Sequence, residues 1–274
     1  MSIDSDTFSE NNISAHFTQN NLPFRFEFHS VLDSTNNYLI TLAGQHEPEG
    51  KVVIAETQSS GRGRLDRHFF SPPGTGIYMS LLLRPQQSAQ NAQMITPAAA
   101  VAVAEAIEKV TSKQAKIKWV NDIFCDGKKV CGILTETAFS PEGEKLAYAV
   151  LGIGINLKEP GSGFPEQIRT TAGAILSEKE YIPGTRNMLA AAILENFWRF
   201  YRELDQKTFL SEYKKRSMLT GQRILVIQDA VSKEATAGEI DDACRLEVFF
   251  DDGSSAILNA GEVRIKPLRI ESLP

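Results

Sequence analysis

The residue pattern changes near residue 220, and this change constrains the fold more than any other feature of the chain. Before it, long helical patterns alternate with apolar strand patterns. After it, residues 221–265 hold about five short runs rich in β-branched and apolar residues, with a turn signal at Asp252-Gly253. Such a series of short strands is typical of a small β-barrel. We therefore expect an α/β domain to which a small β-barrel is appended.

Apolar runs of two different periods predict the elements of the α/β domain. Thr96 and Pro97 stand at the start of one helical run, which predicts Thr96 as the N-cap. Residues 1–22 are polar and rich in Asn and Ser, so we expect a loose leader. Helices are expected at 96–110 and 185–204, and strands at 51–57, 76–85, 116–137 (folded around a turn at Asp126-Gly127) and 145–157.

Charge and cysteine content exclude several classes of protein. Lys and Arg total 29 against 34 Asp and Glu, a net charge of -5, which argues against a general DNA or RNA binder. The three cysteines form no CxxC pair, and a sparse, odd count suits a reducing cytosol, so a cytoplasmic location is expected. No signal peptide and no membrane-spanning apolar run is found, so no membrane association is expected.

The stretch "SSGRGRLDRHFFSPPGTG" (59–76) is a basic island in an acidic chain. Its glycines allow a ligand to approach the backbone closely, and arginine offers a fork of donors suited to phosphate or carboxylate. A solvated hairpin with surface arginines is the alternative. The run lies between two predicted buried strands and carries two phenylalanines and two prolines, which favours a ligand-binding loop. Its candidate binding residues are Gly61, Arg62, Gly63, Arg64 and Arg67.

A second stretch, "KWVNDIFCDGKKVCGI", places Asn121 and Asp122 opposite Lys128 and Lys129 across the expected hairpin. A carboxylate there could hold Mg²⁺, and a lysine could neutralise charge that develops on an α-phosphate. The alternative is that Asn121 and Asp122 only shape a turn and that the lysines are solvated. The Rossmann and P-loop fingerprints are both absent, as are the GxSxG and HExxH hydrolase motifs.

A third stretch, "DSTNNYL" (33–39), predicts a helix N-terminus capped by Asp33, Ser34 or Thr35. The backbone amides of such a terminus can also face a ligand. Taken in order along the chain, the three stretches, together with "GIGINL" and "AGEVRI", resemble the biotin protein ligases (biotin–[acetyl-CoA-carboxylase] ligases) over about residues 27–265. Lipoate ligases share the fold of this family but lack its GRGR signature.

The resemblance implies an α+β fold: a mixed β-sheet flanked by helices, like the class II synthetases and biotin–lipoate ligases, and then an SH3-like β-barrel. With the leader at 1–22, it places the catalytic domain at 23–219 and the barrel at 220–274. Members of the family use ATP and Mg²⁺ to make biotinyl-5′-AMP and pass biotin to a lysine of a biotin carboxyl carrier domain. Too few residues precede the catalytic region here for the helix-turn-helix of some members, so we expect no DNA-binding repressor role.

The resemblance also assigns roles to single residues. Arg62, Arg64 and Lys129 match the catalytic residues, with Lys128 the less favoured of the two lysines. The residues that match the biotin site are Ser34, Thr35, Asn36, Gln58, Gly61, Arg62, Gly63, Arg64 and Lys129. The residues that match the nucleotide site are Arg64, Arg67, Phe69, Asn121, Asp122, Lys129 and Asn156, with Asp122 also the expected metal ligand.

Three positions depart from the family pattern. Asp66 brings a negative charge into the phosphate loop, Phe69 stands where Trp is usual, and Val120 replaces the usual Pro. We expect Phe69 to stack on adenine with less contact area than Trp, and the backbone before Asn121 to be less restrained. Two alternatives to a biotin ligase remain open at this point: a lipoate-type protein ligase, and a non-catalytic module whose arginine loop binds anions.

Overall fold

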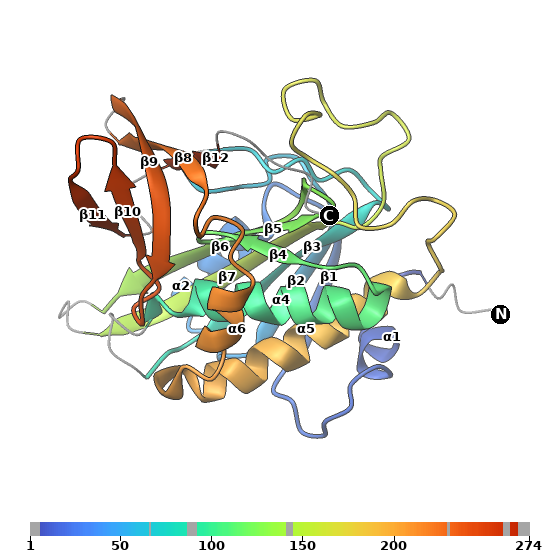
Figure 1. Cartoon of the computed structure of the whole chain (residues 1–274). Coiled ribbons are helices and arrows are strands. Elements are labelled where there is room, and N and C mark those ends of the chain that lie inside the picture. The colour runs from blue at the N-terminus through green and yellow to red at the C-terminus, as the bar shows by residue number, and fades with distance from the viewer. Residues whose placement is uncertain are drawn as a thin grey trace.

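A mixed seven-stranded sheet forms the centre of the computed structural model, which describes residues 6–65, 67–86, 92–140, 145–228, 231–259 and 264–267 (Figure 1). The strand order is β1-β2-β3-β7-β6-β5-β4, and only β1 and β2 pair in parallel. The mixed sheet expected from the resemblance is therefore confirmed. The strands are β1 (Arg25–Leu32), β2 (Lys51–Gln58), β3 (Gly76–Leu83), β4 (Lys116–Lys118), β5 (Asp122–Cys125), β6 (Lys128–Phe139) and β7 (Leu146–Asn156).

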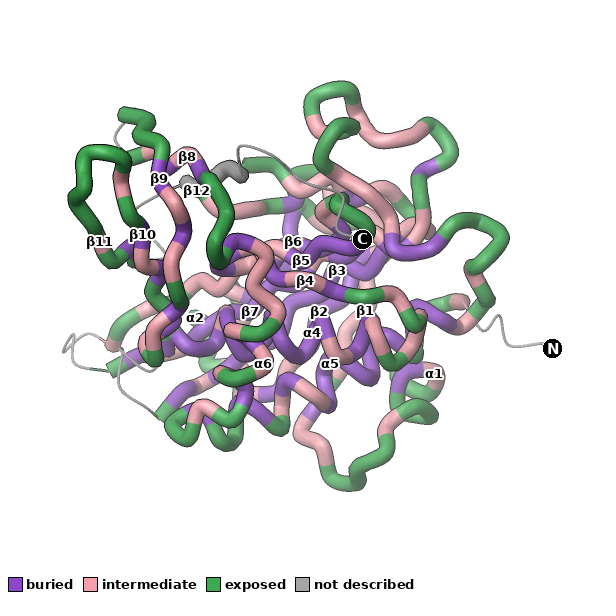
Figure 2. Tube along the Cα trace, in the orientation of Figure 1, coloured by how far each residue is buried: buried purple, intermediate pink, exposed green. Residues whose placement is uncertain are grey.

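Helices cover both faces of this sheet. The helices α4 (Ile95–Thr111) and α5 (Thr185–Arg202) pack against each other and bury one face, as Figure 1 shows. The helix α2 (Thr35–Gly44) covers the other face, where a smaller apolar cluster separates it from the central strands. Because both faces are covered, every residue of β3 is buried and its sequence is a nearly continuous apolar run. Figure 2 shows the buried residues concentrated in the sheet and in α4.

The expected helices and strands between residues 51 and 204 are confirmed, and each begins and ends within two residues of the prediction. The predicted cap of α4 is wrong. The helix begins at Ile95, Met94 stands at the N-cap position without a side-chain hydrogen bond, and Pro97 lies inside the first turn. The hydroxyl of Thr96 is engaged elsewhere, in a 2.8 Å hydrogen bond with the hydroxyl of Thr135 on β6. No described helix is both long enough and apolar enough to cross a bilayer.

The described part of the leader is packed, not loose. It contains α1 (Glu10–Ser14), and the side chains of Phe8 and Ile13 are buried in the main core. The carboxylate of Glu195 on α5 accepts hydrogen bonds from the backbone of Thr18 and Gln19 at 2.9 and 2.7 Å. The expectation failed because two buried side chains and one carboxylate suffice to anchor a segment whose composition is otherwise polar.

A second sheet, antiparallel and five-stranded, follows the short helices η1 (Leu204–Gln206) and α6 (Leu210–Lys215). Its strand order is β11-β10-β9-β8-β12. The change of pattern near residue 220 thus marks a real change of architecture. Asp66 and residues 260–263 of the "AGEVRI" stretch lie outside the described residues. The strands are β8 (Arg223–Gln228), β9 (Val231–Ile240), β10 (Leu246–Phe250), β11 (Ser255–Leu258) and β12 (Arg264–Pro267).

Candidate active site

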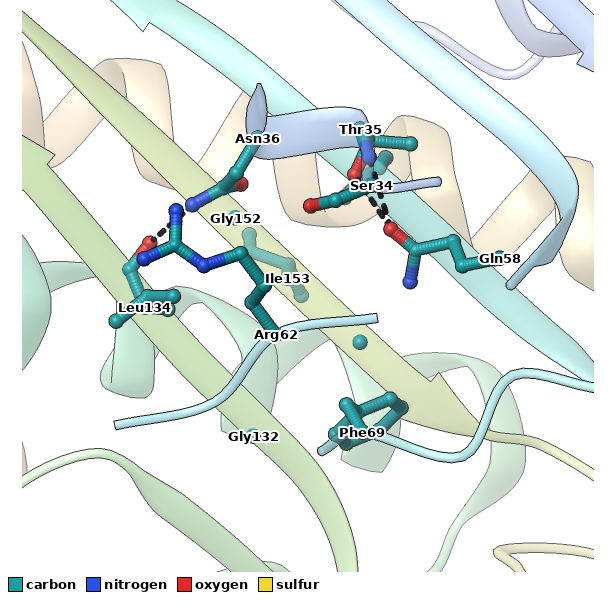
Figure 3. A pocket seen from close by; sticks show the side chains of 12 residues that line it. Ser34, Thr35, Asn36, Gln58, Arg62, Phe69, Gly132, Leu134, Gly152 and Ile153 are labelled. Atoms are coloured by element: carbon teal, nitrogen blue, oxygen red, sulfur yellow. Dashed lines mark hydrogen bonds between the residues drawn. The ribbon is translucent and has the colours of Figure 1, made fainter. Parts of the chain in front are cut away.

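Three glycines leave a strip of the sheet without side chains where β6 and β7 pair. Gly132 and Gly154 are direct cross-strand partners, and Gly152 lies two residues earlier on β7. The ring of Phe69 lies against Gly132 and Gly154, so that a Cβ at position 154 would be 2.6 Å from the ring. A Cβ at Gly152 would lie under 3.0 Å from the side-chain amide of Asn36. The glycines therefore form the floor of a small pocket, which Figure 3 shows from close by.

The N-terminus of α2 supplies one wall of this pocket. Ser34, one of the three capping residues that the sequence offered, is the N-cap, and its hydroxyl accepts a 3.5 Å hydrogen bond from the backbone amide of Asn37. Thr35 and Asn36 are almost fully buried, and both side chains hydrogen-bond the buried hydroxyl of Ser80 on β3, at 2.7 and 2.6 Å. A buried polar group needs such a partner. The network fixes the orientation of the two side chains before any ligand binds.

Gln58, at the end of β2, lines the pocket beside Thr35 (Figure 3). Its carbonyl oxygen accepts hydrogen bonds from the backbone amide and the hydroxyl of Thr35, at 2.9 and 3.2 Å. Its amide nitrogen donates to the hydroxyl of Ser71 at 2.9 Å. The hydrogen bonds of Gln58, Thr35 and Ser80 are therefore all between neutral groups, and of these residues and Ser71 the sequence analysis did not predict Ser71 and Ser80.

The glycine-arginine loop folds back on itself over the pocket. The amide of Gly63 donates to the carbonyl of Arg67 at 2.7 Å, and the amide of Phe69 donates to the carbonyl of Gly61 at 2.7 Å. A Cβ at Gly61 would lie only 2.8 Å from the hydroxyl of Ser71, so this close approach requires glycine. The side chain of Arg67 is exposed. The loop is thus a short hairpin in which Gly61 is needed for packing.

Arg62 closes the mouth of the pocket. Its guanidinium donates to the carboxylate of Glu136 on β6 at 2.8 Å and to the side-chain oxygen of Asn37 at 2.8 Å. Glu136 also accepts a 2.9 Å hydrogen bond from the amide of Asn36. With Arg62 and Phe69 in place the cavity measures only about 20 Å³, whereas pockets for small-molecule ligands measure about 300–1,000 Å³. A ligand of that size would therefore fit only if the loop moved.

A second group of side chains, all charged or amide-bearing, surrounds the β5–β6 hairpin. The Nζ of Lys129 forms a 2.6 Å ion pair with the carboxylate of Asp122, and both are partly exposed. Arg64 donates to the side-chain oxygen of Asn121 at 3.1 Å, and Asn121 donates to the carbonyl of Ile133 at 2.9 Å. Burial lowers the pKa of Arg64, an effect that the nearby carboxylate of Asp122 opposes. Four side chains that the sequence analysis assigned to the nucleotide site thus form two pairs, Lys129 with Asp122 and Arg64 with Asn121.

The two adjacent lysines point to different partners. Lys129 faces the charged group, whereas the Nζ of Lys128 donates to the carbonyl of Thr170 at 2.7 Å. Thr170 belongs to the long connection between β7 and α5. The same connection accepts a hydrogen bond from Asn156, whose amide donates to the carbonyl of Gly173 at 3.1 Å.

Two long-range hydrogen bonds restrain the backbone before Asn121, which the sequence analysis expected to be less restrained because Val120 replaces proline. The hydroxyl of Tyr213 on α6 donates to the carbonyl of Val120 at 3.1 Å. The indole of Trp119 donates to the carbonyl of Cys244, between β9 and β10, at 2.8 Å. Val120, although it lacks the ring of proline, is therefore held in place by side chains that are distant in the sequence.

Arg64 also borders a larger cleft of about 440 Å³ that runs beside β6. Val120, Thr135 and Leu65 are among the residues that line it. Phe69 borders the small pocket with the residues expected to bind biotin. Among the described residues, no three His, Cys, Asp or Glu side chains are grouped to hold a metal ion. Asp122 is the one carboxylate of the charged group, which suits an ion that arrives with phosphate ligands.

Comparisons with known proteins agree with this geometry. The model of the biotin/lipoate A/B protein ligase family matches residues 28–156. A biotin–[acetyl-CoA-carboxylase] ligase from Paracoccus denitrificans is 31% identical over 244 residues, which cover 84% of this chain and 96% of that protein. The bifunctional ligase/repressor BirA of Bacillus subtilis (strain 168) is 40% identical over 148 residues, 54% of this chain and 45% of BirA. The chain thus spans about half the length of the first curated relatives that it matches.

The fold has solved counterparts as well. A biotin protein ligase from Aquifex aeolicus, in complex with biotin and ATP, superimposes with a TM-score of 0.72 at 21% identity, covering 89% of this chain and 99% of that one. A biotin acetyl coenzyme A carboxylase synthetase from Helicobacter pylori gives a TM-score of 0.55 at 17% identity, covering 86% and 100%. At these identities the likeness concerns the fold.

Proposed function

Because this chain belongs to the biotin protein ligase family, we propose that it is an ATP-dependent enzyme that makes biotinyl-5′-AMP and transfers biotin to a lysine of a biotin carboxyl carrier domain. One observation supports this proposal above the others. A closed pocket lined by neutral donors and acceptors, with Arg62 at its mouth, lies beside a group of two cations (Arg64 and Lys129), one carboxylate and one amide. Arg62 and Arg64 belong to one loop, which therefore borders both parts of the site. A neutral ring with a carboxylate tail suits the first, and a nucleotide phosphate suits the second.

The residues of the neutral half bind and orient biotin in this proposal. Gln58 faces the ureido ring, since its amide is already aligned by Thr35 and Ser71. The glycine floor lets a flat ring lie directly on the sheet. Arg62 must leave Glu136 to admit biotin, and it then closes over the bound ligand as the loop returns. A glycine-containing loop of this kind suits closure and exclusion of water.

The charged half prepares the reaction of two anions. In the first step a carboxylate oxygen of biotin attacks the α-phosphorus of ATP, and pyrophosphate leaves. Arg62, Arg64 and Lys129 supply positive charge where negative charge develops, and such preorganised groups are typically worth about 2.7–4 kcal/mol each. In the second step the amine of the carrier lysine attacks the activated carbonyl, and AMP leaves.

In the bound state the phosphate replaces Asp122 as the partner of Lys129. Asp122 would then hold Mg²⁺ together with the phosphates, and the ion would supply further charge neutralisation. We include three finer points in the proposal. The five-stranded sheet is an SH3-like barrel domain, the carrier belongs to a carboxylase, and the protein acts in the cytoplasm. The three free, buried cysteines suit the last point.

The test is mass spectrometry of a purified biotin carrier domain after incubation with the protein, biotin and MgATP. We expect a mass increase of one biotinyl group on one lysine, with release of pyrophosphate. Competition between biotin and lipoate separates a biotin ligase from a lipoate ligase. Binding of either acid without release of pyrophosphate would refute both enzymes and leave the anion-binding module.

A further inference from the structure

A short segment of the β7–α5 connection pairs with the start of β6. The backbone amide of Lys129 donates to the carbonyl of Thr171 at 2.8 Å, and the amide of Gly173 donates to the carbonyl of Lys129 at 2.9 Å. The Nζ of Lys128 adds a 2.7 Å hydrogen bond to the carbonyl of Thr170. The segment therefore holds both the backbone amide and the backbone carbonyl of Lys129, the proposed catalytic lysine.

The same segment also pairs with the end of β7. Asn156 donates its side-chain amide to the carbonyl of Gly173 at 3.1 Å, and its own carbonyl accepts from the amide of Ile175 at 3.1 Å. The carbonyl of Leu157 accepts from Leu176 at 2.9 Å. Gly173 consequently hydrogen-bonds both Lys129 and Asn156, two residues that belong to different strands and to the same expected nucleotide site.

Gly173 is required for space and not for conformational freedom. A Cβ at this position would lie under 3.0 Å from the Cβ of Lys128 and 3.1 Å from its Cγ, although the backbone of Gly173 does not have a positive φ. The Cβ of Lys128 is fixed by the backbone of β6 and cannot swing away as the tip of a long side chain can. Any side chain at position 173 must therefore push the segment away from β6.

From these contacts we propose that Gly173 and Lys128 form a latch that positions Asn156 relative to Lys129 for the reaction with ATP. Both are positioning residues that act through their neighbours. The inference rests on the proposed function, because it uses the nucleotide roles of Lys129 and Asn156. It gives Lys128 a role different from that of the adjacent lysine.

Opening the latch affects the two substrates differently. Displacement of the segment moves Asn156 and the backbone of Lys129, both of which belong to the nucleotide side. Among the described residues, α2 and Gln58, which form walls of the proposed biotin pocket, share no hydrogen bond with the segment. Since a misplacement of about 1 Å can cost about 10²-fold in rate, we expect kcat/KM for ATP to fall by about 10²-fold in Gly173→Ala. The KM for biotin should stay within about twofold.

The matched control is Gly161→Ala in the same connection. Gly161 has no heavy atom within 4 Å of the position of a Cβ and no positive φ, so its kinetics should equal those of the wild type. The kinetic readout is biotin- and ATP-dependent pyrophosphate release, measured over a matrix of both substrates. A loss in Gly173→Ala that falls equally on biotin and ATP would refute the latch, because it would indicate general damage.

A double-mutant cycle tests the contact itself. Lys128→Gly removes the atoms that a Cβ at position 173 would meet. In that background, Gly173→Ala should cost less than about threefold, compared with about 10²-fold alone. Equal costs in the two backgrounds would refute the proposed contact.

Limited trypsin digestion adds a readout that does not depend on activity. Arg169 lies next to the segment and its side chain is largely exposed. Gly173→Ala should accelerate cleavage after Arg169, and the double variant should return the rate to that of Lys128→Gly. If the wild-type protein forms no biotinyl-AMP, the proposed function fails; unchanged cleavage in Gly173→Ala refutes the latch whatever the activity.

Discussion

The two halves of the candidate site are held by different kinds of interaction. The proposed biotin side consists of buried amides and hydroxyls whose partners are neutral apart from the Glu136 carboxylate that Asn36 contacts, and Ser80 and Gln58 fix them before a ligand binds. The nucleotide side consists of partly exposed charges, with Lys129 paired to Asp122. In the proposed function, a neutral ring meets groups that are already aligned, whereas a phosphate replaces an existing partner. Rigidity therefore suits the first half and exchangeable ion pairs suit the second.

The largest effect should follow from removing the central charge of the nucleotide side. We expect Lys129→Ala to lower the rate of biotinyl-AMP formation by a factor on the order of hundreds, because one preorganised cation is lost where charge develops. The KM for biotin should change far less. The measurement is pyrophosphate release with saturating biotin, and Lys179→Ala, an exposed lysine outside the site, is the control. An unchanged rate in Lys129→Ala would contradict the division into two halves.

The second-largest effect should be a rise in the KM for biotin alone, after a substitution on the proposed biotin side. Gln58→Leu leaves the backbone amide and hydroxyl of Thr35 without their acceptor, and an unpaired buried donor costs about 1–3 kcal/mol. We therefore expect the KM for biotin to rise by about tenfold or more, with the KM for ATP unchanged. Gln45→Leu, at the exposed C-terminal end of α2, is the control. A rise in both KM values would mean that the halves are coupled more strongly than their contacts indicate.

The sequence predicted the motif residues of both halves and most of the central sheet, because glycines, arginines and turn residues act locally. It missed Ser80, which lies inside the apolar run of β3, and Glu136, which lies within the predicted strand β6 and outside any motif. A single serine in a fully buried strand was the available signal, since such a hydroxyl must have a partner. The packing of the leader and the pairing of residues 170–176 could not be predicted, because both depend on contacts between segments that are far apart in the chain.

Ser80 connects the rigidity of the biotin side to the stability of the fold. Ser80→Ala removes the partner of the Asn36 side-chain oxygen and of the Thr35 hydroxyl, both buried. We expect the free energy of unfolding to fall by about 1–3 kcal/mol, as measured by urea denaturation. Ser177→Ala, an exposed serine on the β7–α5 connection, is the control. No loss of stability in Ser80→Ala would show that the network of neutral hydrogen bonds does not hold this half of the site.

The smallest effect on stability should come from the contact that holds α2 against β1. There a charged residue, Glu27, supports the helix that forms part of the proposed biotin side. The hydroxyl of Tyr38 on α2 donates to the carboxylate of Glu27 on β1 at 2.6 Å, and Lys51 pairs with the same carboxylate at 2.7 Å. Burial alone would raise the pKa of Glu27, but hydrogen bonds from Lys51, Tyr38 and His29 outweigh burial and lower the pKa from 4.5 to about 2.

A pKa that is lower in the folded state stabilises the fold above the unfolded value and loses this effect as the pH falls. The stability difference between the wild type and Glu27→Gln should therefore be complete above a pH of 4.5 and vanish as the pH approaches about 2. Tyr38→Phe should cost about 1 kcal/mol at neutral pH and leave both KM values within about twofold, because it removes one hydrogen bond outside the pocket. Denaturation curves across this pH range measure both variants. A stability difference for Glu27→Gln that did not depend on pH would show that the carboxylate does not support α2 through its charge.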